Sequence, residues 1–394
     1  PDVLVLNEID YDPQGAALAA FCDNYLAAPQ HASQSPAGPA LPISFPHRRA
    51  FPSNTGEHSG HDLDRNGTVD ATLGNPAYGN DCFGYGIYPG EYAMALLSRY
   101  PVDEAAIREF RKFLWKDMPG AMLPDDPATP APADWYSADV LAAIRLSSKN
   151  HVDVPVLIAG RRIHLLLSHP TPPVFDGLED RNGRRNHDEL RFWRDYIADV
   201  ANGGPEASGR RPEVARGAPA EPLAAASGQG AYITDDAGRS GGLAAGTIPP
   251  FPSGSQPAGD ISKGPSPSFI IAGDLNGDPY DGDSSAGIVA LLAAPQLRRR
   301  PAPASQGGAE AARVQGAINA RHRGDPAHDT EDGADDPGPG NLRLDYLLPS
   351  ADLAVAGAGV FWPETADPLS ALTAGAAEPA SSDHRLVWID LTLP

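Results

Sequence analysis

Residues 268–279, SFIIAGDLNGDP, lie near the middle of the chain and decide its fold class. The run FIIA is apolar, long enough for a buried strand and too short for a helix. Because residues two positions apart share one face of a strand, Asp274 and Asn276 should project together from its carboxyl end. Open α/β sheets bind their ligands at that end of their strands. A strand that merely ends in a polar turn accounts for the stretch equally well.

Other strand-like segments also end in acidic or histidine residues, which favours a functional site. Residues 3–8 read VLVLNE, so an apolar strand leads into Glu8. Residues 163–169 read IHLLLSH and end at His169, and the segment SSDH at 381–384 precedes a further apolar run. Each pattern alone is common in loops, but together they place acids and histidines at the ends of several strands.

With LDY at 344–346, these segments resemble the motifs of the endonuclease/exonuclease/phosphatase superfamily, the metal-dependent phosphoester hydrolases related to pancreatic deoxyribonuclease and the exonuclease III group. The motifs LNE, a strand ending in histidine, GDLN, a strand containing DY, and SDH occur in the order found in that family. The resemblance implies a four-layer α/β sandwich, in which two packed mixed β-sheets are flanked by helices. It extends over residues 3–390, so we expect residues 1–394 to form a single domain.

The resemblance also implies a metal site. Glu8 is the first candidate for a metal ligand and Asp383 the second. Asp274 and Asn276 would hold the attacking water and a phosphate oxygen. Oxygen ligands of this kind suit Mg²⁺, Mn²⁺ or Ca²⁺ rather than Zn²⁺. An earlier strand that carries an asparagine at the family's metal site has no counterpart here, so we expect the chain to lack its N-terminal strand.

Two histidines complete the implied catalytic set. His384 would act as a general base or as a donor to the phosphate, and Asp345 of the DY strand would orient it. His169 would lie on the phosphate or leaving-group side. The family's catalytic arginine has no clear motif here, and the nearest basic candidates for binding phosphate are Lys149 and Arg145.

The function that the resemblance implies is metal-dependent hydrolysis of a phosphoester, as in a phosphodiesterase or nuclease. Two alternatives stay open: a phosphomonoesterase on the same fold, and a binding module that keeps the fold without activity. The sequence contains neither a G-x-S-x-G nucleophile motif nor a G-x-x-x-x-G-K-[ST] phosphate loop.

The charged residues of the sequence limit the kinds of molecule that the protein is expected to bind. The chain has 51 acidic and 30 basic residues, a net charge of −21. Such a charge repels polyanions, so we expect no strong binding to duplex nucleic acid. A local phosphoester, in a small molecule or a nucleic acid, remains a suitable substrate for what we expect to be a monomer. No stretch is apolar for long enough to span a membrane.

Gly and Pro, at 41 and 42 residues, predict long irregular segments. We expect irregular or disordered insertions at 29–76, 202–267 and 298–340. The histidines and acids of the last segment would lie in a solvated loop rather than at a metal site. Helical spacing of apolar residues predicts helices at 103–115 and 187–201, and the charged residues 176–187 would form a loop before the second.

The first insertion contains a calcium-type loop, DLDRNGTVD at 62–70. Its oxygen-bearing side chains lie at positions 1, 3, 5 and 9, and glycine lies at position 6. A structural calcium ion and a merely polar turn remain alternatives, because position 12 is a leucine. The candidate ligands are Asp62, Asp64, Asn66 and Asp70.

The two cysteines, Cys22 and Cys82, are either a disulfide or two buried thiols. We favour the disulfide. With the acidic charge and the calcium-type loop, it predicts a secreted or periplasmic protein.

Overall fold

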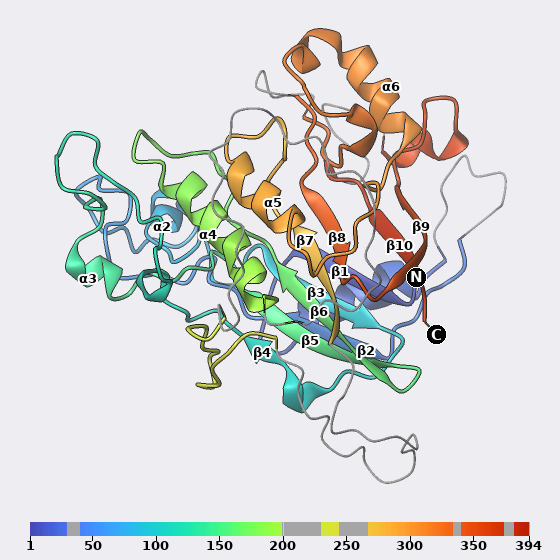
Figure 1. Cartoon of the computed structure of the whole chain (residues 1–394), viewed down its shortest axis with the longest axis horizontal. Coiled ribbons are helices and arrows are strands. Elements are labelled where there is room, and N and C mark those ends of the chain that lie inside the picture. The colour runs from blue at the N-terminus through green and yellow to red at the C-terminus, as the bar shows by residue number, and fades with distance from the viewer. Residues whose placement is uncertain are drawn as a thin grey trace.

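The computed structural model describes residues 1–29, 40–198, 200, 230–243, 267–333, 340–373 and 382–393. Most of the predicted insertion 202–267 lies outside these residues. The described part of the chain contains two layers of β-sheet between layers of helix (Figure 1).

The central layer is a five-stranded sheet in the order β4–β5–β6–β7–β8. Its strands are β4 Arg108–Glu109, β5 His151–Ile158, β6 Arg161–Ser168, β7 Ser268–Asp274 and β8 Asp345–Pro349. β6 and β7 are parallel and the other neighbours are antiparallel, so the sheet is mixed. Ala159 and Gly160 join β5 to β6, and their φ values of 51° and 77° match the two-residue turn that suits a twisted hairpin.

Two smaller antiparallel sheets form the neighbouring layer. One has the order β1–β3–β2 and the other pairs β9 with β10. Their strands are β1 Val3–Ile9, β2 His47–Phe51, β3 Ala93–Ser98, β9 Ala354–Val360 and β10 Val387–Thr392. β1 contacts β7 and β10 contacts β8, so both small sheets lie against the same face of the central sheet.

Side chains of the central sheet alternate between two cores. Leu165 and Leu167 of β6 pack between the sheets, whereas Leu166 packs on the opposite face. β7 follows the same rule, with Ile270 between the sheets and Ile271 opposite. This two-residue period explains why the apolar runs 165–167 and 269–272 do not alternate with polar residues, since both faces of these strands are buried there.

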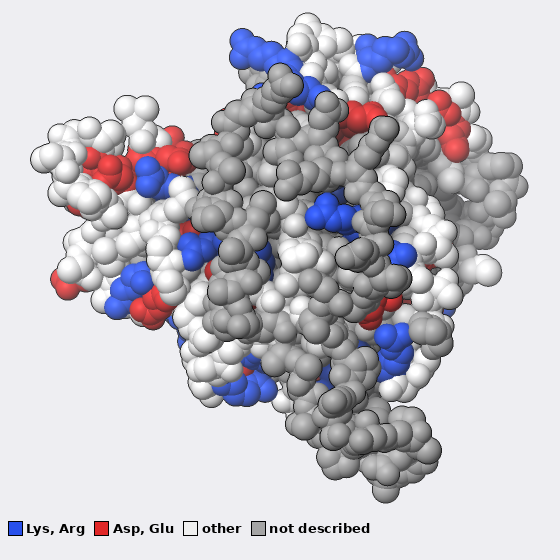
Figure 2. All heavy atoms as spheres, in the orientation of Figure 1, with Lys and Arg blue, Asp and Glu red and all other residues white. Residues whose placement is uncertain are grey.

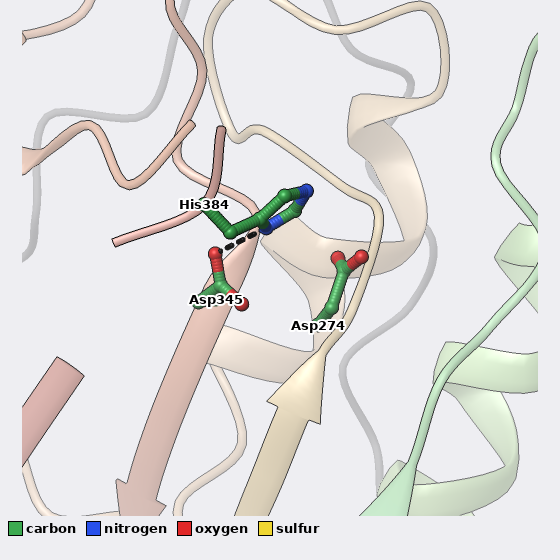
Figure 3. Close-up of side chains that lie close together, drawn as sticks. All are labelled: Asp274, Asp345 and His384. Atoms are coloured by element: carbon green, nitrogen blue, oxygen red, sulfur yellow. Dashed lines mark hydrogen bonds and ion pairs between the residues drawn. The ribbon is translucent and has the colours of Figure 1, made fainter. Parts of the chain in front are cut away.

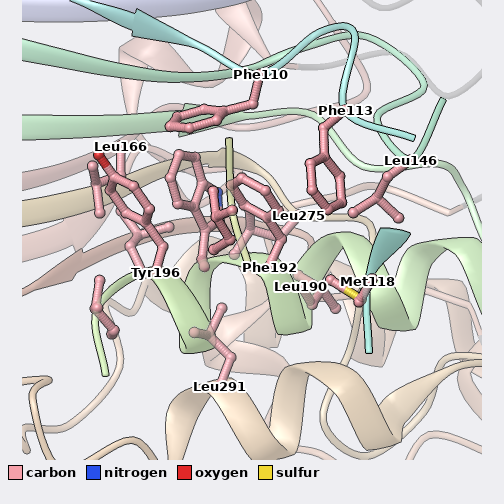
Figure 4. Packing of buried hydrophobic residues seen from close by; sticks show 14 of the residues in the cluster. Phe110, Phe113, Met118, Leu146, Leu166, Leu190, Phe192, Tyr196, Leu275 and Leu291 are labelled. Atoms are coloured by element: carbon pink, nitrogen blue, oxygen red, sulfur yellow. The ribbon is translucent and has the colours of Figure 1, made fainter. Parts of the chain in front are cut away.

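Helices cover the two outer faces. α4 (Arg181–Tyr196) and α5 (Ser285–Leu292) pack on the central sheet, where Leu190 and Phe192 contact Leu166 and neighbouring rings (Figure 4). α1 (Ala16–Phe21) and the π-helical turn η1 (Cys22–Leu26) cover the three-stranded sheet. The predicted four-layer α/β sandwich is therefore confirmed.

The remaining helices are short. They are α2 Pro76–Asn80, α3 Ala138–Leu141, α6 Gln306–Gln315 and the 3₁₀ turns η2 Glu104–Ala106, η3 Trp115–Asp117, η5 Gly316–Asn319, η6 Pro326–His328 and η7 Pro368–Leu372. α6 lies within 298–340 and β2 within 29–76, so neither segment is wholly irregular. β2 forms because it pairs with β3, and Ser305 caps the start of α6.

Two other expectations are wrong. Residues 103–115 do not form one helix, because Arg108 and Glu109 pair with β5 as the edge strand β4. Cys22 and Cys82 are both free and buried. Cys22 packs under α1, whereas the Cys82 thiol donates to the carbonyl of Tyr78 in α2. Within the described residues, the structure contains no helix of the length and hydropathy needed to cross a membrane.

Candidate functional site

The ends of the parallel strands β6 and β7 bring His169 beside Asp274. Leu167 pairs with Ala272, so the residues that follow them leave the sheet at the same edge. Gly273, at φ 148°, permits this approach, because a Cβ atom there would lie 1.9 Å from the carbonyl oxygen of Ser168. The Nε2 atom of His169 lies 3.3 Å from Oδ2 of Asp274. Both side chains are buried, so the pair is shielded from water.

Asp274 and Asn276 do project together, but β7 ends at Asp274, so Asn276 reaches this side through a left-handed conformation and not through strand alternation. The backbone N–H of Asn276 donates to Oδ1 of Asp274 at 2.9 Å, and its side-chain amide donates to Oδ2 at 3.2 Å. The same amide donates to the carbonyl of Pro170 at 3.1 Å. Leu275, between the two, is fully buried on the opposite side in the core under α4. Asn276 has φ 47°, a left-handed conformation that asparagine tolerates better than most residues.

Asp345 lies directly across from Asp274. The antiparallel register of β7 and β8 pairs these two residues. His384, which precedes β10, contacts Asp345 from above, with Nδ1 2.8 Å from Oδ2 (Figure 3). Asp274, Asp345 and His384 each offer one ligand atom, and these atoms lie within 4.8 Å of one another. Three segments far apart in the sequence therefore meet at one point.

The charges of these side chains shift one another's pKa. Burial lowers the pKa of His384, but the hydrogen bond and charge of Asp345, with nearby carboxylates, raise it to about 11. Burial raises the pKa of Asp274, but the hydrogen bond and charge of His169 lower it to about 2. Burial raises the pKa of Asp345, and its hydrogen bond with His384 opposes the rise. In the pair of Asp345 and His384, we assign the proton to His384, because Asp274 adds a second negative charge beside them.

The donor set suits a divalent cation. Two carboxylates face each other across neighbouring strands, and His384 is the partner of only one of them. Asp and Glu oxygens are the ligands that Mg²⁺, Mn²⁺ and Ca²⁺ take in proteins. A cation here would neutralise the surplus negative charge, so the residues fit the metal that the resemblance implies.

The two predicted metal ligands differ in their placement. Glu8 lies at a β-bulge, where the pairing of β1 with β3 shifts between Leu6 and Ile9. Its φ is 58°, and its carboxylate, although largely exposed, lies 3.9 Å from Nε2 of His169. The carboxylate of Asp383 accepts a hydrogen bond from Ser382. Among the described residues, no contact joins Asp383 to Glu8, and Asp383 is not part of the cluster with Asp274.

Of the two predicted phosphate-binding residues, only Lys149 lies at this site. Its Nζ donates to the carbonyl of Pro170 at 3.3 Å, the same carbonyl that Asn276 contacts. Burial lowers the pKa of Lys149, while the charges of Glu189, Asp274 and Glu8 oppose this. Arg145 instead forms an ion pair and a ring contact elsewhere. Its Nη2 lies 2.7 Å from Oε1 of Glu57, and its guanidinium stacks on Phe83.

Helix α4 contributes two buried polar residues, Asn186 and Glu189. The sequence predicts a loop at Asn186 and does not single out Glu189. The amide of Asn186 donates to the carbonyls of Thr171, Leu275 and Asn276 at 2.9, 3.2 and 2.9 Å. Glu189 accepts from the backbone N–H groups of Ser148 and Thr171 at 2.8 and 2.7 Å. α4 thus ties together the three loops that carry Lys149, His169 and Asn276. The spacing of Asn186 to Leu190, Trp193 and Ile197 is the signal that could have placed Asn186 on the inner face.

Glu331 also lies at the site, although it belongs to the predicted insertion 298–340. Its backbone bridges to Leu342 and His384. Burial raises its pKa to about 7; the charge of His384 opposes the rise, and neighbouring carboxylates add to it. The preceding residue, Thr330, accepts hydrogen bonds from the backbone of Leu344 and Asp345. Nothing in the sequence distinguishes Glu331 from the other acids of this segment.

The calcium-type loop folds around a different acid from the predicted one. Asp62, Asp64 and Asp81 form the cluster that could hold an ion. Asp62 accepts from the backbone of Asn66 and Gly67, as in a tight polar loop. The carboxylate of Asp70 accepts from Thr72 and Asn75, and Asn66 from Thr68. Asp81 binds the backbone N–H groups of Leu63 and Asp70 and fills the place expected of Asp70.

The sequence model of the endonuclease/exonuclease/phosphatase family matches residues 1–201 and 235–384. A comparison with curated proteins returned no match.

Several solved structures are similar. An endonuclease/exonuclease/phosphatase from Beutenbergia cavernae has 14% identity and a TM-score of 0.43, over 100% of this chain and 63% of that one. A family protein from Leptotrichia buccalis has 12% identity and a TM-score of 0.37, over 100% and 87% of the two chains. Sphingomyelinase C from Streptomyces griseocarneus has 14% identity and a TM-score of 0.35, over 99% and 83%. The chain thus spans less than two thirds of the first of these structures.

Proposed function

Because the chain belongs to the endonuclease/exonuclease/phosphatase family, whose members are phosphoester hydrolases and mostly use a divalent metal, we propose that it hydrolyses a phosphodiester with the help of such an ion. The observation that carries this proposal is the meeting of Asp274, Asp345 and His384 at the edge of the central sheet. A module that only binds its ligand has no need to keep a histidine hydrogen-bonded to one of two opposed carboxylates.

Glu8 and Asp274, which both lie beside Nε2 of His169, would hold the cation. Asp383, predicted as the second ligand, is left out because its described side-chain contact is with Ser382. When bound, the cation would neutralise the phosphate, activate the attacking water and lower the pKa of His384 by cancelling carboxylate charge. Proton transfer and hydrogen bonding to the phosphate would belong to side chains of the protein.

His384 is oriented by Asp345. Because Nδ1–H donates to Asp345, Nε2 is the atom left to exchange a proton with water or with a phosphate oxygen. Asn276 and Lys149 both donate to the carbonyl of Pro170, and Lys149, which has further N–H groups, would supply a donor to the phosphate. The two amide N–H groups of Asn276 are taken by Pro170 and Asp274, so Asn276 would position Asp274. His169 would contribute a further donor on the side of Asp274. Preorganised donors of this kind stabilise charge that develops in the transition state.

The substrate is proposed only as a class. On the face drawn in Figure 2, basic side chains are interspersed with acidic ones and form no single basic patch among the described residues. With the net charge of −21, this supports a small or locally bound phosphoester over tightly bound duplex nucleic acid. Export from the cell stays a prediction, and it has less support now that both cysteines are free.

The experiment compares a chromogenic phosphodiester with the matching monoester, each with Mg²⁺, Mn²⁺ or Ca²⁺ and again with chelator. Turnover of the diester that disappears with chelator and with His384→Ala supports the proposal. Faster turnover of the monoester would favour the phosphomonoesterase instead. If circular dichroism shows that the chain is folded and neither compound is hydrolysed, the binding module is the remaining alternative.

A further inference from the structure

A second buried cluster of charged side chains lies beyond the site described above. It forms where the loop after Asn276 meets the segment that follows α6. His322 lies between two carboxylates there: Nδ1 is 3.4 Å from Oδ2 of Asp281, and Nε2 is 3.5 Å from Oδ2 of Asp329. All three side chains are at least 95% buried. A solvated loop, expected for this segment, does not describe it.

Three of these polar atoms have no hydrogen-bond partner among the described residues. They are both ring nitrogens of His322 and Oδ2 of Asp329. Asp281 differs, because it accepts from the backbone N–H groups of Arg323 and Gly324 at 2.7 and 2.8 Å. A buried polar atom without a partner costs free energy, and native proteins rarely leave several together. The open side of the cluster is therefore the one between Nε2 of His322 and Asp329.

The cluster also carries excess negative charge. Asp278, Asp281 and Asp329 are its carboxylates, and within the described part of the chain only Arg323 forms an ion pair with any of them besides His322. Burial, and then the charges of Asp278 and Asp281, raise the pKa of Asp329 to about 9. The surroundings thus lack positive charge at the place where the unpaired atoms lie.

We propose that His322 and Asp329, with Asp281 at the other ring nitrogen, bind a divalent cation of the kind that combines imidazole with carboxylate ligands, such as Zn²⁺ or Mn²⁺. Metal–ligand bonds of about 2.0–2.2 Å place two ligands of one ion roughly 3–3.5 Å apart, as Nε2 and Oδ2 are here. One imidazole nitrogen binds one ion, so the ion lies on the side of Asp329. Neither His322 nor Asp329 belongs to the cluster of Asp274, Asp345 and His384.

The position of the cluster gives the ion a structural role. Asp281 follows closely on Asn276, while Asp329 directly precedes Thr330 and Glu331. Thr330 and Glu331 in turn contact the backbone at Asp345 and His384. An ion at His322 would fasten the loop after β7 to the segment that borders the other half of the candidate active site.

The test is diffraction at the zinc absorption edge from crystals of the unaltered chain, stripped with chelator and then supplied with Zn²⁺ at neutral pH. We expect an anomalous peak within about 2.2 Å of Nε2 of His322 and of Asp329. A peak at Asp274 alone, or none, would overturn the proposal and identify His322 as a protonated side chain shared by two carboxylates. This measurement needs no variant and no activity.

Variants give an independent readout in solution. Zn²⁺ should raise the melting temperature of the unaltered chain and of His384→Ala, which alters only the first site. The increase should shrink in His322→Gln and Asp329→Asn. His328→Gln is the matched control, since His328 lies in the same segment but bonds the carbonyl of Pro303. An equal zinc effect in His322→Gln and His328→Gln, both folded by circular dichroism, would contradict the proposal.

Discussion

Asp274 and Asp345 occupy directly opposed positions on the neighbouring strands β7 and β8. Like charges placed across a strand pair destabilise a sheet, and burial increases the cost. The sheet tolerates them because His169 contacts the first and His384 the second. This placement is poor for stability and good for holding a cation, so we attribute it to function.

The hydrogen bond between Asp345 and His384 predicts the effect of Asp345→Asn on stability. The carboxylate of Asp345 is the main cause of the raised pKa of His384, about 11, so its removal takes a stabilising partner from a protonated imidazole. Relief of the like-charge contact with Asp274, about 0.2–1 kcal/mol, offsets only part of this loss. The melting temperature in chelator at neutral pH should therefore fall, which thermal unfolding measures. A higher melting temperature would contradict this account.

The second prediction concerns His384. Removing a positioned proton-transfer group should reduce diester turnover by about 10²–10⁴-fold, with a smaller effect on KM. The test compares the turnover of His384→Ala with that of a control variant, Glu310→Gln, which lies on α6, far from the strand ends. Equal rates in the two variants would exclude a catalytic role for His384.

The third prediction concerns helix α4. Asn186→Ala leaves three buried carbonyls without their donor, which should cost about 1–3 kcal/mol of stability for the first unsatisfied group and more for the set. Glu189→Gln keeps the size of the side chain, but its NH₂ would face a backbone N–H at either Ser148 or Thr171. Denaturant unfolding gives the stability. Turnover should fall mainly in kcat, since the loops that carry Lys149, His169 and Asn276 would lose their common support.

A fourth prediction follows from His151, which is buried and neutral. Burial, opposed by the charge of Glu189, lowers its pKa from 6.5 to about 4. Above pH 6.5 neither state holds the proton and His151 has no effect. As pH falls from 6.5 to 4, only the unfolded state gains the proton, so the fold should lose about 3 kcal/mol. Urea unfolding at several pH values measures this loss, which should be smaller in His151→Gln than in His328→Gln.

A fifth prediction concerns Gly273. An added Cβ would lie 1.9 Å from the carbonyl oxygen of Ser168, and the φ of 148° disfavours any side chain. Gly273→Ala should therefore weaken the parallel pairing of β6 with β7 and separate His169 from Asp274. We expect a loss of at least about 1–3 kcal/mol in unfolding free energy and a loss of turnover. Normal stability in this variant would show that the two strands can move apart freely.

The motifs of the sequence predict the fold and much of the site, because their residues lie at strand ends. There, the two-residue period predicts that Asp274 and Asn276 share a face and that Leu275 enters the core, although β7 ends at Asp274 and hydrogen bonds to Asp274 and Pro170 hold Asn276 in place. The family order then places Asp345 and His384 with them. Their contacts are present in the structure, while their catalytic roles stay predictions.

Other features depend on tertiary packing that no local pattern reports. Glu189 looks like a surface residue of a charged helix until the three loops above α4 are in place. His322 is buried only because the segment after α6 folds back on the loop of Asp281. Arg145, predicted at the phosphate, pairs with Glu57 instead, since charge alone does not determine which partner is nearest.

The pairing of β10 with β9 has a consequence for the order in which the molecule assembles. His384 precedes β10, which pairs with β9 and not with the sheet that carries Asp274. The segment that carries the imidazole is therefore held by a C-terminal ribbon and by its bridge to Glu331, and not by a strand of the central sheet. Partial melting of that ribbon would leave the central strands intact and remove His384 alone. Amide hydrogen exchange should then be faster in β9 and β10 than in β6 and β7, and inactivation by denaturant should precede global unfolding.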